Sequence, residues 1–204
     1  MPQRGRLITL EGVDGAGKST HLDSIRERLH ARGHRVIVTR EPGGTELAEK
    51  LRALVLSQPM DALSETLLMF AARADHVQRV IAPAIAAGAW VLCDRFTDAT
   101  LAYQGAGKGV AQDLIERLAE AVHPGLQPDR TFLFDCSYEV SKQRLGAAGK
   151  QLDRFEREDR EFFERVRKGY LVQAVKQPQR FTVVDASREL AEIRQFLAVD
   201  IDRL

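Results

Sequence analysis

Asparagine is absent from the 204-residue chain, and cysteine is scarce. The two cysteines, Cys93 and Cys136, lie within or just after apolar runs and show neither metal-ligand spacing nor a disulfide framework. We therefore expect both to be small core residues of a cytoplasmic protein. No stretch is long and apolar enough to span a bilayer, and Met1 to Arg6 lacks the features of a signal peptide.

An excess of charge of one sign is also missing. The 30 basic residues are balanced by 29 acidic ones, so the formal net charge is +1. No global field is present that would attract nucleic acid or a membrane surface, and neither is expected as a partner. The length suits a single domain, 1–204, whose specificity must lie in a local site.

Five short apolar runs rich in β-branched residues are predicted to be strands. They are Leu7 to Leu10, Val36 to Thr39, Trp90 to Cys93, Thr131 to Phe134 and Phe181 to Val184. Segments with helical periodicity separate them, the first with Leu22, Ile25 and Leu29 on one face and Gly33 at its end. This alternation predicts an α/β fold of three layers, in which helices flank a five-stranded parallel sheet. Ligands of such sheets bind beyond the carboxyl ends of the strands.

A glycine-rich segment, Gly12 to Ser19, joins the first predicted strand to the first predicted helix. Its sequence, GVDGAGKS, has two glycines separated by four residues and followed by lysine and serine, which is the P-loop pattern. The backbone N–H groups and the helix N-terminus would hold phosphate, Lys18 would reach the β and γ phosphates, and Ser19 can ligate Mg²⁺. The segment predicts a P-loop NTPase fold that binds ATP and Mg²⁺, against the alternative of an ordinary glycine-rich turn. The residues expected at the nucleotide are Gly12, Val13, Asp14, Gly15, Ala16, Gly17, Lys18, Ser19 and Thr20.

A P-loop alone does not distinguish GTPases, motor ATPases and small-molecule kinases. Guanine-specific GTPases usually read the base with an Asn-Lys-x-Asp segment, which a chain without asparagine cannot contain. A kinase needs a second cationic site that holds the acceptor in line with the donor. Arg40, Arg73 and Arg95 are placed to form such a site.

Two segments at the ends of predicted strands resemble a known family. Thr39 to Thr45, with the sequence TREPGGT, and Asp94 to Phe96, with the sequence DRF, resemble signature motifs of bacterial thymidylate kinases. Tyr103 to Gly105 and the region of Leu152 to Arg154 extend the resemblance over most of the chain. It implies transfer of the γ-phosphoryl group of ATP to deoxythymidine monophosphate (dTMP) by a homodimer packed through helices.

The resemblance also implies roles for individual residues. Phe70 would stack on the thymine ring, and Arg73 would contact the base or the acceptor phosphate. Arg40 and Arg95 would hold the monophosphate, because a guanidinium offers paired donors to phosphate oxygens. Asp94 would help to organise Mg²⁺, directly or through water.

The sugar and the base edge involve four further positions under the same resemblance. Asp14 would approach the 3′-hydroxyl of the deoxyribose and the guanidinium of Arg95. Thr100 and Gln104 would address the base edge, and Tyr103 would crowd the 2′ position and so favour deoxyribose.

Plainer interpretations compete for three of these residues. Phe70 follows other apolar residues of a predicted helix and would suit a core. Arg73 would suit a surface helix, and Arg40 would suit an ion pair with Glu41 or Glu46.

The segment 144–155 is predicted to be the lid that closes over the donor phosphates and excludes water. The P-loop contains no arginine, which resembles the design in which the lid supplies the catalytic cation. Gly146 to Gly149 contains none either, so the available cations are Arg144, Lys150 and Arg154. Our hypothesis is that Arg154 or Arg144 stabilises the transferring group with help from Lys150, and the alternative is that all three are solvated loop charges.

The predicted catalytic set is Lys18, Arg95, Asp14, Arg154 and Arg144, with Ser19 and Asp94 at the metal. The acceptor is already a phosphate anion, so no general base is needed. The five histidines, His21, His30, His34, His76 and His123, are accordingly expected to be surface or helix residues. Two alternatives stay open: a kinase for another nucleoside monophosphate, and an ATP-binding switch that has lost catalysis.

Two helices of the second half are also predicted. The charged stretch Asp153 to Lys168 carries several apolar residues and is expected to form an amphipathic helix. Leu114, Leu118 and Val122 would form an apolar helix face that serves either the core or a subunit interface.

Overall fold

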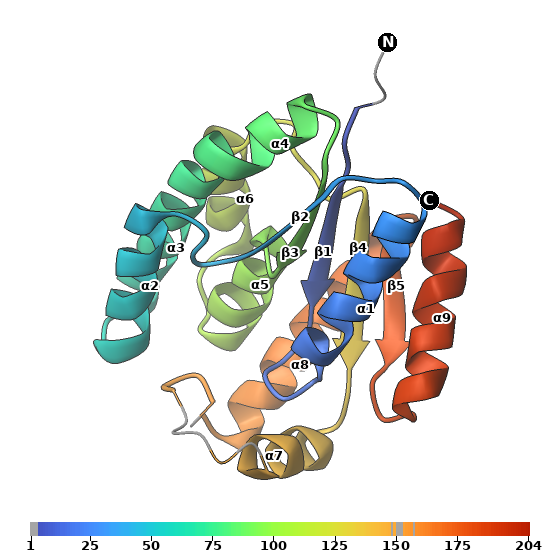
Figure 1. Cartoon of the computed structure of the whole chain (residues 1–204). Helices are drawn as coiled ribbons and strands as arrows, with labels where there is room; N and C mark the ends of the chain where they lie inside the picture. The colour runs from blue at the N-terminus through green and yellow to red at the C-terminus, as the bar shows by residue number, and fades with distance from the viewer. Residues whose placement is uncertain (1–3, 148, 150–152, 157) are drawn as a thin grey trace.

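The five predicted strands lie in one parallel sheet with the order β2-β3-β1-β4-β5 (Figure 1). The structure is a computed structural model and describes residues 4–147, 149, 153–156 and 158–204. Its strands are β1 Leu7–Glu11, β2 Val36–Arg40, β3 Trp90–Asp94, β4 Arg130–Asp135 and β5 Phe181–Asp185. Each strand contains the run predicted for it, so the α/β class with a five-stranded parallel sheet is confirmed.

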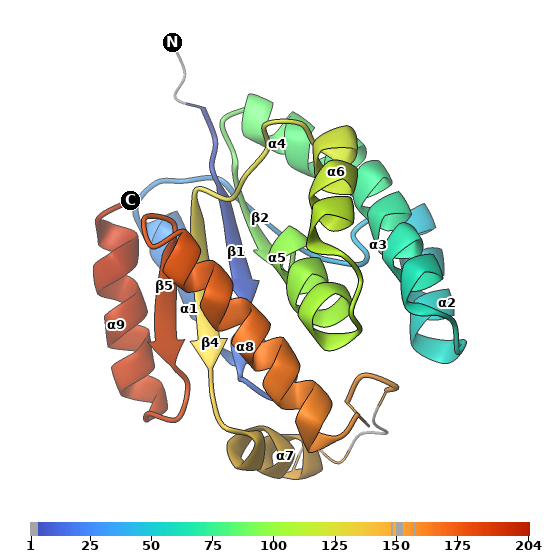
Figure 2. The ribbon, with the colours of Figure 1, turned by 180° about the vertical axis from the view of Figure 1, so that it is seen from behind.

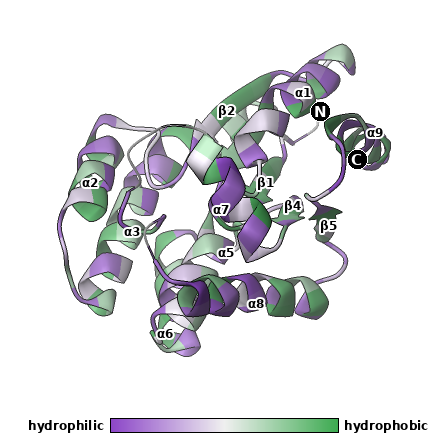
Figure 3. Cartoon of the chain, turned by 90° about the horizontal axis from the view of Figure 1, so that it is seen from below, coloured by the Kyte–Doolittle hydropathy of each residue, from purple (hydrophilic) through white to green (hydrophobic). Residues whose placement is uncertain are grey.

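Helices cover both faces of this sheet and complete the three predicted layers. Helices α1 (Lys18–Ala31) and α9 (Leu190–Asp202) pack on one face, and α8 (Arg160–Lys176) lies on the opposite face (Figures 2 and 3). Two segments, η1 (Val77–Ile81) and η2 (Leu101–Gly107), are π-helical. The remaining helices are α2 Glu46–Ser57, α3 Ala62–His76, α4 Ala82–Ala86, α5 Thr97–Thr100, α6 Gln112–Val122 and α7 Tyr138–Ala147.

The sheet is most deeply buried at its centre. All residues of β1 are buried, whereas the edge strands are more accessible: β2 has only half-buried and exposed residues, and β5 mixes buried, half-buried and exposed ones. A central strand covered by helices on both faces tolerates few polar side chains unless they have partners. Polar residues at the carboxyl end of this strand are therefore expected to have a functional role.

The parallel register gathers such polar residues at one edge. Arg40 at the end of β2 lies opposite Asp94 of β3, and Asp94 lies opposite Leu10 of β1. Glu11 ends β1 beside them. The segments that follow β1, β2 and β3 are thus brought together as the sequence predicts for a ligand site.

The amphipathic helix predicted from Asp153 begins later than expected. The Asp153 side chain accepts hydrogen bonds from the backbone N–H groups of Phe155 and Glu156, which makes a turn. Helix α8 starts at Arg160, where the N-cap residue Asp159 accepts from the Phe162 N–H at 2.8 Å. The prediction was wrong for residues 153–156, 158 and 159, because the Asp153 side chain binds backbone N–H groups in a turn and Asp159 caps the helix that follows.

Cys93 and Cys136 are buried free thiols, as expected. Within the described part of the chain, no helix has the length and apolar character needed to cross a membrane.

Candidate active site

The P-loop lies between β1 and α1, in the frame that its sequence predicts. Gly17 caps α1 in the left-handed conformation, with φ 91°. Gly12 has φ 135°, and a Cβ atom there would lie 2.3 Å from the carbonyl oxygen of Phe134. A side chain at either position would be strained, so the backbone can follow this path only with glycine.

Lys18 lies in this loop with its ammonium directed back onto it. Its Nζ donates to the carbonyl oxygens of Gly12 at 2.9 Å and Val13 at 3.1 Å. Burial, together with the positive charge of Arg95, lowers the pKa of Lys18. A phosphate anion bound beside the loop would offset the desolvation of the ammonium and its repulsion by Arg95. Lys18 is therefore suited to bind phosphate. A cavity opens beside the loop, and the exposed residues Ser19 and Thr20 line it.

Arg95 occupies the centre of a hydrogen-bond network. Its Nη2 donates to Asp14 Oδ1 at 2.6 Å and to the Tyr103 hydroxyl at 3.0 Å, and its Nη1 donates to the Tyr170 hydroxyl at 3.1 Å. The Tyr103 hydroxyl in turn donates to Asp14 Oδ2 at 2.8 Å. Arg95 itself has φ 70°, an unusual backbone conformation for a residue with a side chain. The expected contact between Asp14 and Arg95 is present.

The charge of Asp14 is secured by this network. Burial opposes ionisation, but the positive charges of Arg95 and Lys18 outweigh it and lower the pKa of Asp14 to about 2. The same interaction raises the pKa of Arg95 further above its ordinary value, against the effect of burial. Both groups therefore remain charged at neutral pH.

Glu11 belongs to the same site and was not among the predicted residues. It is fully buried, accepts from the Phe96 N–H at 2.7 Å and accepts from the Tyr170 hydroxyl at 2.9 Å. Burial, with a contribution from Asp98, raises the pKa of Glu11 to about 8. An acidic residue directly after the mostly apolar run Leu7 to Leu10 was the available signal, because a buried carboxylate needs partners.

A second cavity opens beside Arg95 and away from the phosphate loop. Its wall includes Pro42, Leu56, Met69, Phe96, Thr100, Tyr103 and Gln104. Asp14, Glu41, Arg52 and Arg95 line both this cavity and the one at the P-loop. The two cavities therefore share a wall of charged residues. We call them the donor cavity, at the P-loop, and the acceptor cavity.

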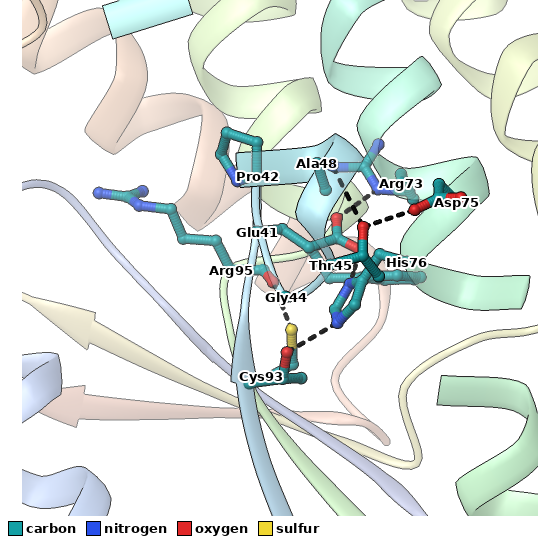
Figure 4. A network of polar contacts seen from close by, with 12 residues as sticks. Glu41, Pro42, Gly44, Thr45, Ala48, Arg73, Asp75, His76, Cys93 and Arg95 are labelled. Carbon is teal, nitrogen blue, oxygen red and sulfur yellow. Dashed lines mark hydrogen bonds and ion pairs between the residues drawn. The ribbon is translucent and has the colours of Figure 1, made fainter. Parts of the chain in front are cut away.

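Arg73 reaches the acceptor cavity as a buried cation. Its Nε donates to Glu41 Oε2 at 2.6 Å, and its Nη2 donates to Thr100 Oγ1 at 3.0 Å. Its Nη1 is buried and has no hydrogen-bond partner. Glu41 also contacts His76, as Figure 4 shows. Arg73 is thus a buried guanidinium with one donor group unused, not the surface charge of the plainer interpretation.

Phe70, the residue predicted to stack on the base, is buried behind Arg73. Phe70 is 2% exposed and packs with Ile115 and Ala119, while Met69 lines the acceptor cavity. Each helical residue is turned by about 100° from the one before it, so Met69 shares the face of Arg73 four residues on. Phe70 supports Arg73 from behind, with its ring 4.7 Å below the guanidinium. In this structure Met69 is thus the residue of this pair that lines the cavity, and the stacking role of Phe70 stays a prediction.

Gln104 and Thr100 line the acceptor cavity as expected. Gln104 Nε2 donates to Glu65 Oε1 at 2.7 Å, which orients its amide. Glu65 is fully buried and also binds Lys108 Nζ at 2.8 Å. This carboxylate was missed because its partners lie far along the chain.

Two further arginines lie at the donor cavity. Arg40 is half exposed and pairs with Glu49 at 3.0 Å, neither with Glu41 nor with Glu46. Arg52, which sequence reasoning missed, donates to the carbonyl oxygen of Pro42 at 3.0 Å and lines both cavities. It lies two helical turns after Thr45, so helical spacing from the TREPGGT segment was the available signal.

The predicted metal residues lie together at the donor cavity. Asp94 Oδ1 is buried without a hydrogen-bond partner, which is costly for a carboxylate unless a cation or water satisfies it. Ser19 lies on the same cavity. Both are oxygen ligands of the kind that Mg²⁺ prefers. Within the described ranges, no group of three or more His, Cys, Asp or Glu side chains is arranged to hold a metal by itself.

The lid cations lie in different places. Arg144 lies in the last turn of α7 beside the P-loop, where its guanidinium donates to the carbonyl oxygens of Ala16 at 3.3 Å and Ala186 at 2.7 Å. Arg154 instead forms an ion pair with Glu65, away from the donor cavity. Lys150 lies outside the described residues. Arg154 would have to leave Glu65 before it could act on the donor phosphates.

The histidines are less exposed than predicted. His21, His76 and His123 are buried. His21 and His76 lie in helices as expected, whereas His123 follows α6 and binds Thr97 Oγ1 at 2.8 Å.

Comparison with known proteins places these features in a family. Residues 10–197 match the sequence model of the family described as thymidylate kinase. A thymidylate kinase of Methylobacillus flagellatus is 56% identical over 192 residues, which cover 94% of each chain. One from Bordetella petrii is 53% identical over 204 residues, covering 100% of this chain and 98% of that one. The crystal structure of thymidylate kinase from Ehrlichia chaffeensis superposes with a TM-score of 0.76 at 33% identity, covering 98% of each chain.

Proposed function

Because the chain belongs to the thymidylate kinase family and is an ATP-dependent nucleoside monophosphate kinase, we propose how its two cavities carry out the phosphorylation of dTMP to dTDP. ATP binds with its phosphates in the donor cavity, and dTMP binds in the acceptor cavity. The transfer is an in-line displacement at the γ-phosphorus, which relies on positioning and charge stabilisation.

The donor is held by Gly12 to Thr20. The backbone N–H groups and the N-terminus of α1 face the phosphates, and Lys18 leaves its carbonyl partners to contact the β and γ oxygens. Ser19 and Asp94 would hold Mg²⁺, directly or through water. When bound, Mg²⁺ neutralises phosphate charge as the bond to the leaving group breaks.

The acceptor phosphate lies between the two cavities. Arg95 presents its guanidinium there, fixed by Asp14 and by the hydroxyls of Tyr103 and Tyr170. A planar guanidinium with a set orientation suits two phosphate oxygens at once. Arg40 supplies a more mobile charge from the donor cavity, because its side chain is half exposed. Asp14 remains available to the 3′-hydroxyl, and the ring of Tyr103 limits the room at the 2′ position.

The base occupies the inner part of the acceptor cavity, between the apolar surfaces of Met69 and Phe96. Arg73 is neutralised by Glu41 at 2.6 Å, so its unused Nη1 suits an uncharged carbonyl oxygen better than a phosphate. This favours the base over the phosphate among the two expected partners of Arg73. Thr100 and Gln104 complete the polar edge that faces the base.

The transferring group also needs a cation from the lid. Arg144 is already beside the P-loop, and we assign it to the donor phosphates. Arg154 reaches the transferring group only in a state in which Glu65 has released it.

The observation that carries this proposal is the position of Asp14. This P-loop residue lines both cavities and accepts a hydrogen bond from Arg95 at 2.6 Å. Donor and acceptor sites are therefore fixed relative to each other by one side chain. Such coupling is what an in-line transfer requires and what a binding switch does not need.

A coupled assay with ATP and Mg²⁺ tests the proposal across a panel of monophosphates. We expect the highest kcat/KM with dTMP. A ribonucleotide or a purine monophosphate as the best acceptor would contradict the roles of Tyr103, Thr100 and Gln104. Absence of diphosphate product with every acceptor would support the switch alternative.

We also propose that the protein is a cytoplasmic homodimer with neither nucleic acid nor membrane as partner. Leu63 and Leu67 are nearly half exposed on one face of α3. Leu118 and Val122 on the neighbouring α6 are half-buried beside the Phe70 cluster. Together they form an apolar surface that a second copy would cover. Light scattering should give twice the mass of the chain, and the monomer mass would contradict the dimer.

A further inference from the structure

Figure 4 shows a buried polar network behind the acceptor cavity, between the segment after β2 and the end of α3. We propose that His76 in this network is a positioning residue for the acceptor nucleotide, which acts through Glu41 on Arg73. The inference rests on the proposed function, in which Arg73 contacts the bound monophosphate. It assigns a role to a histidine that touches neither substrate.

The Glu41 carboxylate is divided between two partners. Oε2 accepts from Arg73 Nε at 2.6 Å, and Oε1 lies 2.9 Å from His76 Nδ1. Both partners are almost completely buried, as is Glu41 itself. Because a carboxylate accepts only, Nδ1 must carry a proton and donate. Each carboxylate oxygen therefore has one hydrogen-bond partner, and the two partners together fix the orientation of the carboxylate plane.

His76 is fixed from its other side by a strand. Its Nε2 lies 2.7 Å from Thr39 Oγ1 on β2. The imidazole also fills the space below the TREPGGT turn, since a Cβ atom on Gly44 would lie 2.5 Å from His76 Nε2. Thr45 at the end of this turn donates to Asp75 Oδ2 at 2.5 Å. Helix α3 is thus joined to the turn by two neighbouring residues, Asp75 and His76.

The arrangement leaves Arg73 with little freedom. Its guanidinium lies 4.7 Å from the ring centroid of Phe70 and 5.2 Å from that of Phe96. Glu41 holds Nε and Thr100 holds Nη2, so that only Nη1 remains for a ligand. The orientation of the Glu41 carboxylate therefore decides where Nη1 of Arg73 points, and His76 fixes the orientation of that carboxylate.

Loss of the contact from His76 has a definite consequence. Burial opposes ionisation of Glu41, but Arg73 and His76 lower its pKa. The charge of Arg73, the largest of these lowering effects, stays in place when the His76 contact is lost, so Glu41 is expected to remain an anion. Its freed oxygen would be a buried acceptor without a partner, which is costly. The carboxylate would turn to share both oxygens with the guanidinium, and Arg73 would be drawn away from the ligand.

Two amide substitutions separate the two contacts of His76. In His76→Asn, the amide nitrogen takes the place of Nδ1, so the contact with Glu41 is kept and that with Thr39 is lost. In His76→Gln, the amide takes the place of Nε2, so the contact with Thr39 is kept and that with Glu41 is lost. The two side chains have the same functional group and a similar polarity.

The test is calorimetric titration of each variant with dTMP and, separately, with a nonhydrolysable ATP analogue. For His76→Gln we expect the Kd of dTMP to rise about tenfold, as for the loss of one hydrogen bond to a charged group. For His76→Asn we expect a Kd within about threefold of the wild type, because that bond is kept. The Kd of the ATP analogue should stay unchanged in both. In steady-state kinetics, the KM of dTMP should rise with little change in kcat.

Leu197→Ala is the matched control for loss of stability. Leu197 is buried in α9 on another part of the sheet and belongs to the main core. We expect this variant to lower the melting temperature without changing the Kd of dTMP.

Three results would overturn the inference. The first is equal affinity of His76→Asn and His76→Gln for dTMP. The second is a loss of affinity in His76→Gln that is as large for the ATP analogue as for dTMP, and the third is a loss of dTMP affinity in Leu197→Ala as large as in His76→Gln. If His76→Gln does not fold, Glu41→Gln replaces it, and dTMP binding as tight as in the wild type would then refute the proposal. Failure of wild-type protein to bind dTMP would instead refute the proposed function.

Discussion

Asp14 and Arg95 are joined at 2.6 Å although 81 residues separate them in the chain. Asp14 belongs to the phosphate loop after β1, and Arg95 follows β3, the strand beside β1. The sheet thus brings the donor loop and the acceptor arginine into direct contact. The first three substitutions below follow from this contact and from its surroundings.

Asp14→Asn should free Arg95 from its main charged partner. We expect the KM of dTMP to rise about tenfold, since a hydrogen bond between charged groups is lost. The KM of ATP should change less, because the backbone of the P-loop is unaffected. Steady-state kinetics with each substrate varied in turn would measure both, and a larger change for ATP would contradict the assignment.

The charge of Asp14 should also be independent of pH near neutrality. Its pKa is lowered from 3.8 to about 2, so the stability that it contributes is present above its unfolded pKa and is lost as pH falls toward 2. Unfolding of wild type and Asp14→Asn between pH 3 and pH 7 would test this. We expect the difference in stability to shrink only at the acidic end.

Glu11 should have the opposite effect on stability. Its pKa is raised from 4.5 to about 8, so the native state binds a proton that the unfolded state lacks between these values. Native stability is then lost as pH rises through this window, and the loss is complete above it. Glu11→Gln keeps an acceptor for the Phe96 N–H and cannot ionise. The melting temperature of Glu11→Gln relative to that of the wild type should therefore rise from pH 5 to pH 9. A difference in melting temperature that does not change with pH would contradict the raised pKa of Glu11.

Lys18→Ala should remove the cation of the phosphate cradle. We expect kcat to fall by about a hundredfold or more, because charge on the transferring group loses a preorganised partner. The fold should persist, since Lys18 contacts only loop carbonyls. Product formation and circular dichroism together would check this, and an active variant would disprove the proposed donor site.

Arg144→Ala tests the lid. We expect a higher KM for ATP and a kcat lowered by about tenfold or more, because Arg144 lies at the P-loop. Arg154→Ala is the comparison, since Arg154 pairs with Glu65 in this structure. Unchanged rates in both variants would defeat the assignment of a lid cation.

The sheet and the phosphate loop could be predicted because their signals are local. Each strand is a short apolar run with turn residues at its ends, and the P-loop pattern is contiguous from Gly12 to Ser19. The contact of Asp14 with Arg95 was predictable only because a family resemblance linked two distant motifs.

The supporting residues could not be predicted for the same physical reason. Glu11, Glu41 and Glu65 are buried carboxylates whose partners lie between 32 and 159 residues away. Neither periodicity nor composition specifies which distant hydrogen-bond donor such a group meets. Met69 shows a second limit: it lines the acceptor cavity but was not among the predicted residues, and a step of one residue turns a helical side chain by about 100°.

The left-handed backbone at Arg95 has a cost that glycine would avoid. An ordinary residue in that region is destabilised by about 1 kcal/mol, and the neighbouring Phe96 N–H is held by Glu11 at 2.7 Å. Glycine at position 95 would relax this bend while removing the guanidinium. The chain therefore accepts a strained backbone at Arg95 because its guanidinium pairs with Asp14, and glycine would relieve the strain but leave that carboxylate without its main partner.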